Sequence, residues 1–136
     1  MSKAFVLILM VLMTISCKKA IEEIQKDLVV EAMTSGQWVV TNYVKGTSNI
    51  TSDFSGYAFV FKENKTVDAI KTGSVQHTGT WDGNANAQTI TSSFNNANVP
   101  LTLLNGTWSI TRNNWTFVEA TQTVNGEVRT LRLDKQ

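Results

Sequence analysis

Side chains able to carry catalysis are few in this chain of 136 residues, which contains one histidine and one cysteine. A hydrolytic or transfer site needs a nucleophile and a base that adjusts its pKa, and His77 is the only imidazole for that role. Many serines and acidic residues can be combined with His77 on paper, but the sequence singles out none of them. We therefore expect no catalytic residue, and we interpret His77 as an ordinary strand side chain beside Thr78.

Metal and cofactor sites are limited by the same scarcity. Zinc sites need several His or Cys ligands, and calcium loops need closely spaced carboxylates around a glycine turn. The segment 82–86, Asp-Gly-Asn-Ala-Asn, has the alternating oxygen ligands of the start of a calcium loop but lacks the later acidic residue. We interpret it as a hairpin tip, because Asp-Gly is a strong turn signal. The sequence predicts no metal and no cofactor.

The single cysteine lies where an export signal would end. Lys3 is followed by an apolar run over residues 4–15 and then by Ser16 and Cys17. A membrane-spanning helix needs roughly 20 apolar residues, so this shorter run fits the core of a signal peptide. The segment 14–17, Thr-Ile-Ser-Cys, resembles the lipobox of bacterial lipoproteins, which implies that the thiol is acylated and the chain is cut before Cys17. An ordinary signal peptide with a chance cysteine is the alternative.

Acylation of Cys17 would tether the protein to a membrane. Each buried methylene contributes roughly 0.8 kcal/mol and one acyl chain holds only marginally, so the several chains, palmitate among them, implied by the resemblance give a stable anchor. Lys18 is not the aspartate that retains lipoproteins at the inner membrane of some Gram-negative bacteria, which implies the outer membrane. Glu22-Glu23 is only a faint version of the acidic run that marks surface display, so the periplasmic and outer faces both stay open.

The chain divides into three parts, and its mature portion is electrically balanced. We expect a signal peptide over residues 1–16, a lipidated tether with a short helix over 17–35, and one domain over 36–136. Lys3 leaves with the signal, so the 12 Lys and Arg of the full chain become 11, equal to the 11 Asp and Glu. A neutral chain has no long-range field to attract nucleic acid, so we expect no nucleic-acid partner.

Two hydrophobic patterns follow one another in the mature chain. Between Lys18 and Met33 apolar residues recur at intervals of three or four, which predicts an amphipathic helix, with a partly ordered tether as the alternative. After Gly36 the sequence is typical of short strands separated by turns, including a type I′ turn at Asn125-Gly126. Leu101–Leu104 predicts either a strand or one turn of helix. The expected strands cover residues 37–44, 57–61, 66–72, 75–81, 88–94, 107–112, 115–124 and 127–133.

Such a chain must protect the edges of its sheet, and closure into a barrel removes those edges. Short hairpins join neighbouring strands and no long Greek-key crossing is found, which favours a barrel over a β-sandwich. We predict an all-β fold, an antiparallel up-and-down barrel of about eight strands with a short N-terminal helix.

Gly-x-Trp occurs three times, with its tryptophans at Trp38, Trp81 and Trp108. The intervals are unequal, which excludes a solenoid or propeller repeat. We expect each glycine where a turn ends and a strand begins, so that the tryptophan two residues later points inward. Three buried indoles would supply much of the apolar area that a domain of this size buries.

Short motifs in a fixed order run from Ser35 to Lys135. They are Gly36-Gln37-Trp38, Phe54-Ser55-Gly56-Tyr57-Ala58-Phe59-Val60-Phe61, Gly79-Thr80-Trp81, Leu104-Asn105-Gly106-Thr107-Trp108 and Leu131-Arg132-Leu133. This set resembles the small lipocalin-like lipoproteins of the Bacteroidetes. The resemblance implies a lipocalin-like barrel in which Trp38 packs at the closed end under a basic side chain of the last strand, here Arg129 or Arg132.

Fold analogy favours a binding module, in which the barrel mouth holds a small apolar or amphipathic ligand. A structural or protein-interaction scaffold of the cell envelope, with another envelope protein as partner, is the alternative. An interior cavity of about 300 Å³ or more would favour the ligand, and a solidly packed interior would count against it. The expected ligand-lining residues are alternate strand side chains: Val40, Tyr57, Phe59, Ile70, Ile90 and Phe117.

Overall fold

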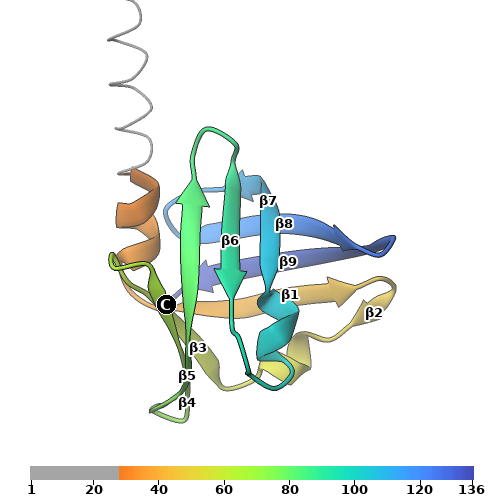
Figure 1. The fold of residues 1–136 in the computed structure, drawn as a ribbon, viewed down its shortest axis with the longest axis horizontal. Helices are drawn as coiled ribbons and strands as arrows, with labels where there is room; N and C mark the ends of the chain where they lie inside the picture. Colours follow the sequence, from red (N-terminus) through yellow and green to blue (C-terminus); the bar gives the residue numbers. More distant parts are fainter. Residues whose placement is uncertain (1–27) are drawn as a thin grey trace, which may run out of the picture.

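The computed structural model describes residues 28–136, so the expected signal peptide, Cys17 and most of the expected tether lie outside the described residues. Within 28–136, eight antiparallel strands close into a barrel, which confirms the predicted fold class (Figure 1). Strands β3 to β9 follow one another round the sheet in chain order, and the pairing of β9 with β1 completes the circle. Residues 28–34 form a short helix against one end of the barrel (Figure 1).

The elements follow the expected hairpin pattern closely. The two-residue strand β2 pairs antiparallel with the end of β1, and together they form a short hairpin. In chain order the elements are β1 (Trp38–Lys45), β2 (Ser48–Asn49), η1 (Thr51–Phe54), β3 (Tyr57–Phe61), β4 (Thr66–Lys71), β5 (Ser74–Asn84), β6 (Thr89–Ser93), η2 (Leu101–Leu104), β7 (Gly106–Asn113), β8 (Phe117–Val124) and β9 (Glu127–Lys135).

Two of the turn and loop predictions are confirmed. Asn125 and Gly126 have φ angles of 50° and 82°, and positive φ at both central residues is the mark of a type I′ turn. Val124 pairs directly with Glu127 across this turn. Leu101–Leu104 forms the short 3₁₀ helix η2, which is the helical one of the two expected alternatives.

The hairpin predicted around residues 82–86 is present between β5 and β6, but the prediction that its turn lies at the Asp-Gly pair is wrong. Asp82 and Gly83 lie inside β5, with Gly83 opposite Ile90 of β6, and the turn follows at residues 85–88. A Cβ atom on Gly83 would lie 3.0 Å from Cγ1 of Val29. This glycine therefore serves the close packing of the helix on the barrel, a contact between segments far apart in the chain.

The expectation that every Gly-x-Trp glycine starts a strand is also wrong in one case. Gly36 and Gly106 lie at strand starts and have φ angles of 77° and 105°. Gly79, in contrast, lies in the middle of β5 opposite Val67. A Cβ atom there would lie 2.5 Å from the carbonyl oxygen of Ser93 and 2.8 Å from Cδ1 of Phe94. Its role is to let two neighbouring strands and an aromatic ring come together.

A bulge in β1 changes which side chains face the interior. Val40 pairs with Leu133 and Asn42 with Arg132, so Thr41 is the extra residue in the ladder. Strict alternation from Trp38 and Val40 would place Asn42 inside. The bulge places Tyr43 there instead, and its side chain is fully buried in the core.

Gly79→Ala should destabilise the barrel by about 1–3 kcal/mol, because the added methyl group meets the Ser93 backbone, which has little freedom to move. Urea unfolding followed by circular dichroism measures the change. Gln76→Ala, at an exposed position of the same strand, is the matched control and should change the midpoint little. Equal midpoints for Gly79→Ala and the parent would contradict the close approach described above.

Candidate functional site

The interior of the barrel is nearly filled. Its cavity measures about 40 Å³. Pockets for small organic ligands usually measure roughly 300–1,000 Å³, whereas about 10–15 Å³ suffices for one water molecule. An organic ligand of ordinary size therefore does not fit without rearrangement of the core. The cavity is lined by Phe59, Phe61, Val67, Ile90, Ser92, Phe94, Leu104, Trp108, Val118, Ala120, Leu131 and Leu133.

The three Gly-x-Trp indoles are buried, as predicted, with exposed fractions of 0%, 2% and 3% for Trp38, Trp81 and Trp108. Each ring N–H donates a hydrogen bond to a backbone carbonyl oxygen. The acceptors are Met33 at 2.9 Å, Lys62 at 2.9 Å and Leu104 at 3.0 Å. Because these donors are already satisfied, the indoles act as structural anchors that join strands to the helix, to the β3–β4 turn and to η2.

The basic side chain over Trp38 is Lys135, whose Nζ lies 5.0 Å from the ring centroid, so the expectation of Arg129 or Arg132 is wrong. Strand register explains the difference, because Trp38 pairs directly with Lys135 of β9. Arg129 pairs with Lys45 at the other end of β1. A basic residue of the last strand does cover the first-strand tryptophan, but the sequence did not reveal which one.

Arg132 lies on the outer face of the barrel, in a network of ion pairs that packs against the ring of Phe117. Its guanidinium donates to both carboxylate oxygens of Asp134, at 2.9 and 3.0 Å, and to Glu119 at 2.8 Å. Arg112 also pairs with Glu119, at 3.1 Å. The Phe117 ring lies 4.4 Å from the Arg132 guanidinium and 5.3 Å from that of Arg112. These two cations and two anions satisfy one another, which indicates a structural role.

The six predicted lining residues do not share one mouth. Phe59 and Ile90 line the interior cavity. Val40 and Tyr57 line a separate surface cleft. Phe117 faces outward, because its neighbours Val118 and Ala120 are the inward residues of β8, and Ile70 alternates in the same way with the buried Ala69 of β4. The prediction that all six residues line one barrel mouth is therefore wrong: two line the interior, two line the surface cleft, and two face outward.

The surface cleft lies along the seam between β1 and β3. Within the described residues these two strands share a single residue pair, Trp38 with Phe59, and then diverge. We call the resulting space the seam cleft, and its volume is about 310 Å³. Val40, Phe54 and Tyr57 give it apolar walls, and Ser55 and Gln136 add polar groups. The full lining is Val39, Val40, Phe54, Ser55, Gly56, Tyr57, Ala58 and Gln136.

Tyr43 is an interior residue that the sequence analysis missed. Its ring stacks on Phe54 with a centroid distance of 5.3 Å, and its hydroxyl donates to the carbonyl oxygen of Leu103 at 2.6 Å. Burial raises the pKa of the Tyr43 hydroxyl, and the nearby Arg129 opposes that rise. No local signal marks Tyr43 as buried, because its orientation depends on the bulge in β1.

Asp68, on the outer face of β4, is the one charged residue that is buried as a whole among the described residues. Lys62 Nζ lies 2.8 Å from it, and the hydroxyl of Thr78 donates to it at 2.7 Å. The hydrogen bond from Lys62, and then that from Thr78, lower the pKa of Asp68. The group is fully paired, so it stabilises the sheet and is not available as a proton donor at neutral pH.

His77 and possible metal-binding clusters are the remaining candidates for chemistry within residues 28–136. His77 lies beside Phe94, with the two ring centroids 6.2 Å apart. In the described part of the chain, no three His, Cys, Asp or Glu side chains are placed to hold a metal ion. None of the helices within 28–136 has the length and apolar character needed to cross a membrane.

Comparison with known proteins supports the fold and no more. No family model matches the chain, and no curated protein matches it. Among solved structures, it is similar to the crystal structure of a DUF4847 family protein from Bacteroides vulgatus ATCC 8482. The two are 15% identical with a TM-score of 0.54, over 79% of this chain and 99% of the other. The barrel therefore has a counterpart in a Bacteroides protein, while the lipoprotein assignment stays a prediction.

Asp68→Asn should lower the free energy of unfolding at pH 7 by about 1–2 kcal/mol, because a charge-assisted hydrogen bond becomes a neutral one while Lys62 stays half-exposed. The carboxylate's pKa is lowered in the folded state, so its contribution is present above the ordinary value of 3.8 and is lost as pH falls below it. The difference between parent and variant should therefore shrink in acid.

Urea unfolding at a series of pH values from 7 down to 2.5 measures this difference. Glu63→Gln, which removes an exposed carboxylate from the adjacent turn, is the control and should have little effect. A parent–variant difference that is the same at every pH would contradict the assigned role of Asp68.

Proposed function

We propose that this protein is a lipoprotein of the cell envelope, held at a membrane by acylated Cys17, whose barrel is a non-catalytic scaffold for another envelope protein. The observation that carries the proposal is the packed interior, with its cavity of about 40 Å³. A barrel filled by its own side chains acts through its outer surface. The resemblance to lipobox sequences supports the anchor, and Lys18 favours the outer membrane over the inner one.

The junction between tether and barrel suits such a role. Met33, at the end of the helix, is 2% exposed, and its carbonyl oxygen accepts the Trp38 N–H. Val29 packs closely against Gly83 of β5. The segment that leads from the membrane is thus fastened to two strands, so the barrel is held in a defined orientation relative to its tether.

Contacts within the barrel wall also hold it in a fixed shape, which suits a scaffold. Closure through β1 and β9 leaves few free sheet edges, and this limits unspecific strand pairing with other chains. The Arg132 network ties β7, β8 and β9 together on the outside, and the hydrogen-bonded indoles tie the ends together on the inside. A rigid surface reduces the entropy lost when a partner binds.

A second candidate function is the binding of a small amphipathic molecule in the seam cleft. The observation that favours it is the volume of about 310 Å³, at the lower limit for small-ligand pockets. Two of the predicted lining residues, Val40 and Tyr57, are among its walls. In this candidate function the ligand binds at the side of the barrel and not in the barrel mouth, where the sequence analysis expected it.

Cys17→Ser should abolish acylation and release the protein from the membrane fraction, because no other thiol is present in the chain. Metabolic labelling with an alkyne analogue of palmitate, followed by fractionation of the envelope, measures both effects. Ser2→Ala, which keeps the lipobox, is the control and should label like the parent. Labelling of Cys17→Ser at the parental level would contradict the anchor.

Native mass spectrometry of the protein extracted from its own envelope separates the two functions. The scaffold proposal expects a protein partner in fixed stoichiometry and no small-molecule adduct. Ser55→Trp, which fills the seam cleft, should leave the scaffold complex intact. Ser74→Trp, at the exposed first residue of β5, is the matched control. A small-molecule adduct that is lost in Ser55→Trp and kept in Ser74→Trp would replace the scaffold with the ligand-binding function.

A further inference from the structure

Trp115 differs from the other tryptophans. All four lie within the described residues, and Trp115 alone is exposed, to 53%. It lies in the turn between β7 and β8, two residues before β8 begins, although the sequence analysis placed it in the strand. Tryptophan is enriched at interfaces where one end of the side chain is apolar and the other wet, so the exposed Trp115 is a candidate for such a contact.

The turn that carries Trp115 is held rigidly. The side-chain oxygen of Asn114 accepts hydrogen bonds from the backbone N–H of Thr116 at 2.8 Å, from the Thr116 hydroxyl at 2.9 Å and from the N–H of Phe117 at 3.0 Å. The backbone N–H of Lys135 donates to the Thr116 carbonyl oxygen at 2.8 Å. The indole is therefore presented by a fixed turn and not by a loose loop.

Trp115 lies beside the helix at the point where the chain enters the fold. It lines a groove of about 230 Å³ with Leu28, Val29, Ala32, Asn113 and Asn114. A second groove of about 230 Å³, which also includes Leu28 and Val29, is lined further by Asn84, Ala85, Gln88, Thr89, Ile110 and Asn113. Leu28 is 43% exposed. We call Leu28, Val29, Trp115 and the residues that line these two grooves the tether-end patch.

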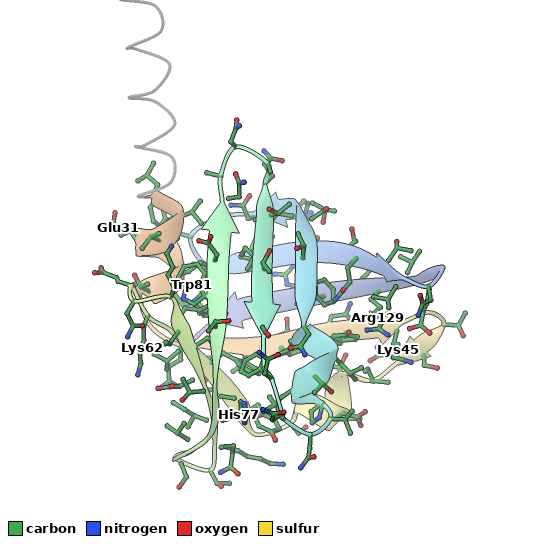
Figure 2. All side chains as sticks on the ribbon, viewed as in Figure 1. Glu31, Lys45, Lys62, His77, Trp81 and Arg129 are labelled. Atoms are coloured by element: carbon green, nitrogen blue, oxygen red, sulfur yellow. The ribbon has the colours of Figure 1, made fainter. Side chains whose placement is uncertain are left out.

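The tether-end patch is apolar at its centre and carries amides at its rim. Among the described residues that line its two grooves, none is charged. The charged cluster of Lys45, Glu127 and Arg129 lies at the other end of the barrel, where Figure 2 shows Lys45 and Arg129 far from the helix. Charged residues border the patch: Glu31 is exposed on the helix, and Arg112, Glu119, Arg132 and Asp134 pair with one another on the strand ends beside the Trp115 turn. The grooves themselves combine an exposed indole with uncharged amide side chains, which matches the headgroup region of a bilayer, where tryptophan is enriched.

Chain length brings this patch to a membrane. The chain from Cys17 to Leu28, eleven residue steps (17 to 28), spans at most about 40 Å when fully extended. A barrel anchored at Cys17 therefore stays near the bilayer, and the end that carries Leu28 and Trp115 is the end that the tether reaches first.

We propose that the tether-end patch is a lipid-contacting surface. Trp115 inserts at the headgroup level, and this end of the barrel faces the bilayer. The inference rests on the proposed function, because it assumes the acyl anchor at Cys17. The opposite end, with the Asn125-Gly126 hairpin and the exposed Val128, then faces away from the membrane and is free for a protein partner.

Brominated lipids quench tryptophan emission at short range and so test the orientation. The acylated full-length protein is reconstituted in phosphatidylethanolamine–phosphatidylglycerol vesicles with and without bromine on the acyl chains. We expect the parent to lose a clear fraction of its emission in brominated vesicles and Trp115→Phe to lose little, because the other indoles are at most 3% exposed.

The matched control moves the exposed indole to the other end of the barrel. Trp115→Phe combined with Val128→Trp places a tryptophan at a site that is 54% exposed in the parent, and it should be quenched no more than Trp115→Phe alone. Equal quenching of the parent and this double variant, or no quenching of the parent, would overturn the orientation. A parent whose Trp115 is instead covered by a second copy or by a protein would also be unquenched.

Flotation of the same vesicles reports the anchor independently. A parent that floats but is not quenched at Trp115 leaves the acyl anchor in place and overturns the lipid-contacting surface alone. An acylated parent that does not float overturns the anchor and this inference together. The outcome that supports both is flotation with quenching that depends on Trp115.

Discussion

The pairing of β1 with β9 is the interaction on which the rest of the structure depends. It runs from Trp38 opposite Lys135 to Lys45 opposite Arg129, whereas in the described residues β1 meets β3 at the single pair of Trp38 and Phe59. Without β9, the first strand would have almost no hydrogen-bonded neighbour in the barrel. This register also places Lys135 over Trp38, and the bulge in it turns Tyr43 inward.

Closure brings with it a nearly solid interior. Three indoles and several phenylalanines meet inside a barrel of eight strands, a size that leaves room for side chains or for one small ligand. In this protein the side chains take the space. The surfaces that can contact other molecules are therefore on the outside of the barrel. They are the seam cleft between β1 and β3, the outer face of the sheet, and the two ends.

The two ends differ in character, and the difference gives the barrel a direction. One end holds the helix and the uncharged grooves beside Trp115, bordered by the ion-paired network of Arg132. The other end holds the cluster around Glu127, where the hydrogen bond from Arg129, and then the charge of Lys45, lower the pKa of the carboxylate. If the chain is anchored at Cys17 as proposed, the end with the helix and Trp115 faces the membrane and the end with Lys45 and Glu127 faces the aqueous side. An anchored barrel with this polarity can present the same surface to a partner in every copy.

The sequence by itself determined the features that local physics controls. Period-two alternation and turn chemistry located most strands, Asn125-Gly126 specified its own turn, and the three Gly-x-Trp motifs identified the buried indoles. Tertiary structure alone decided which basic residue covers Trp38, that Gly79 and Gly83 serve close packing inside a strand, and that Phe117 faces outward. These outcomes depend on register and bulges between segments distant in the chain, and one residue of shift reverses the face of every side chain that follows. The cavity volume is of the same kind, because it is the small difference between the space that closure encloses and the volume of the side chains that fill it.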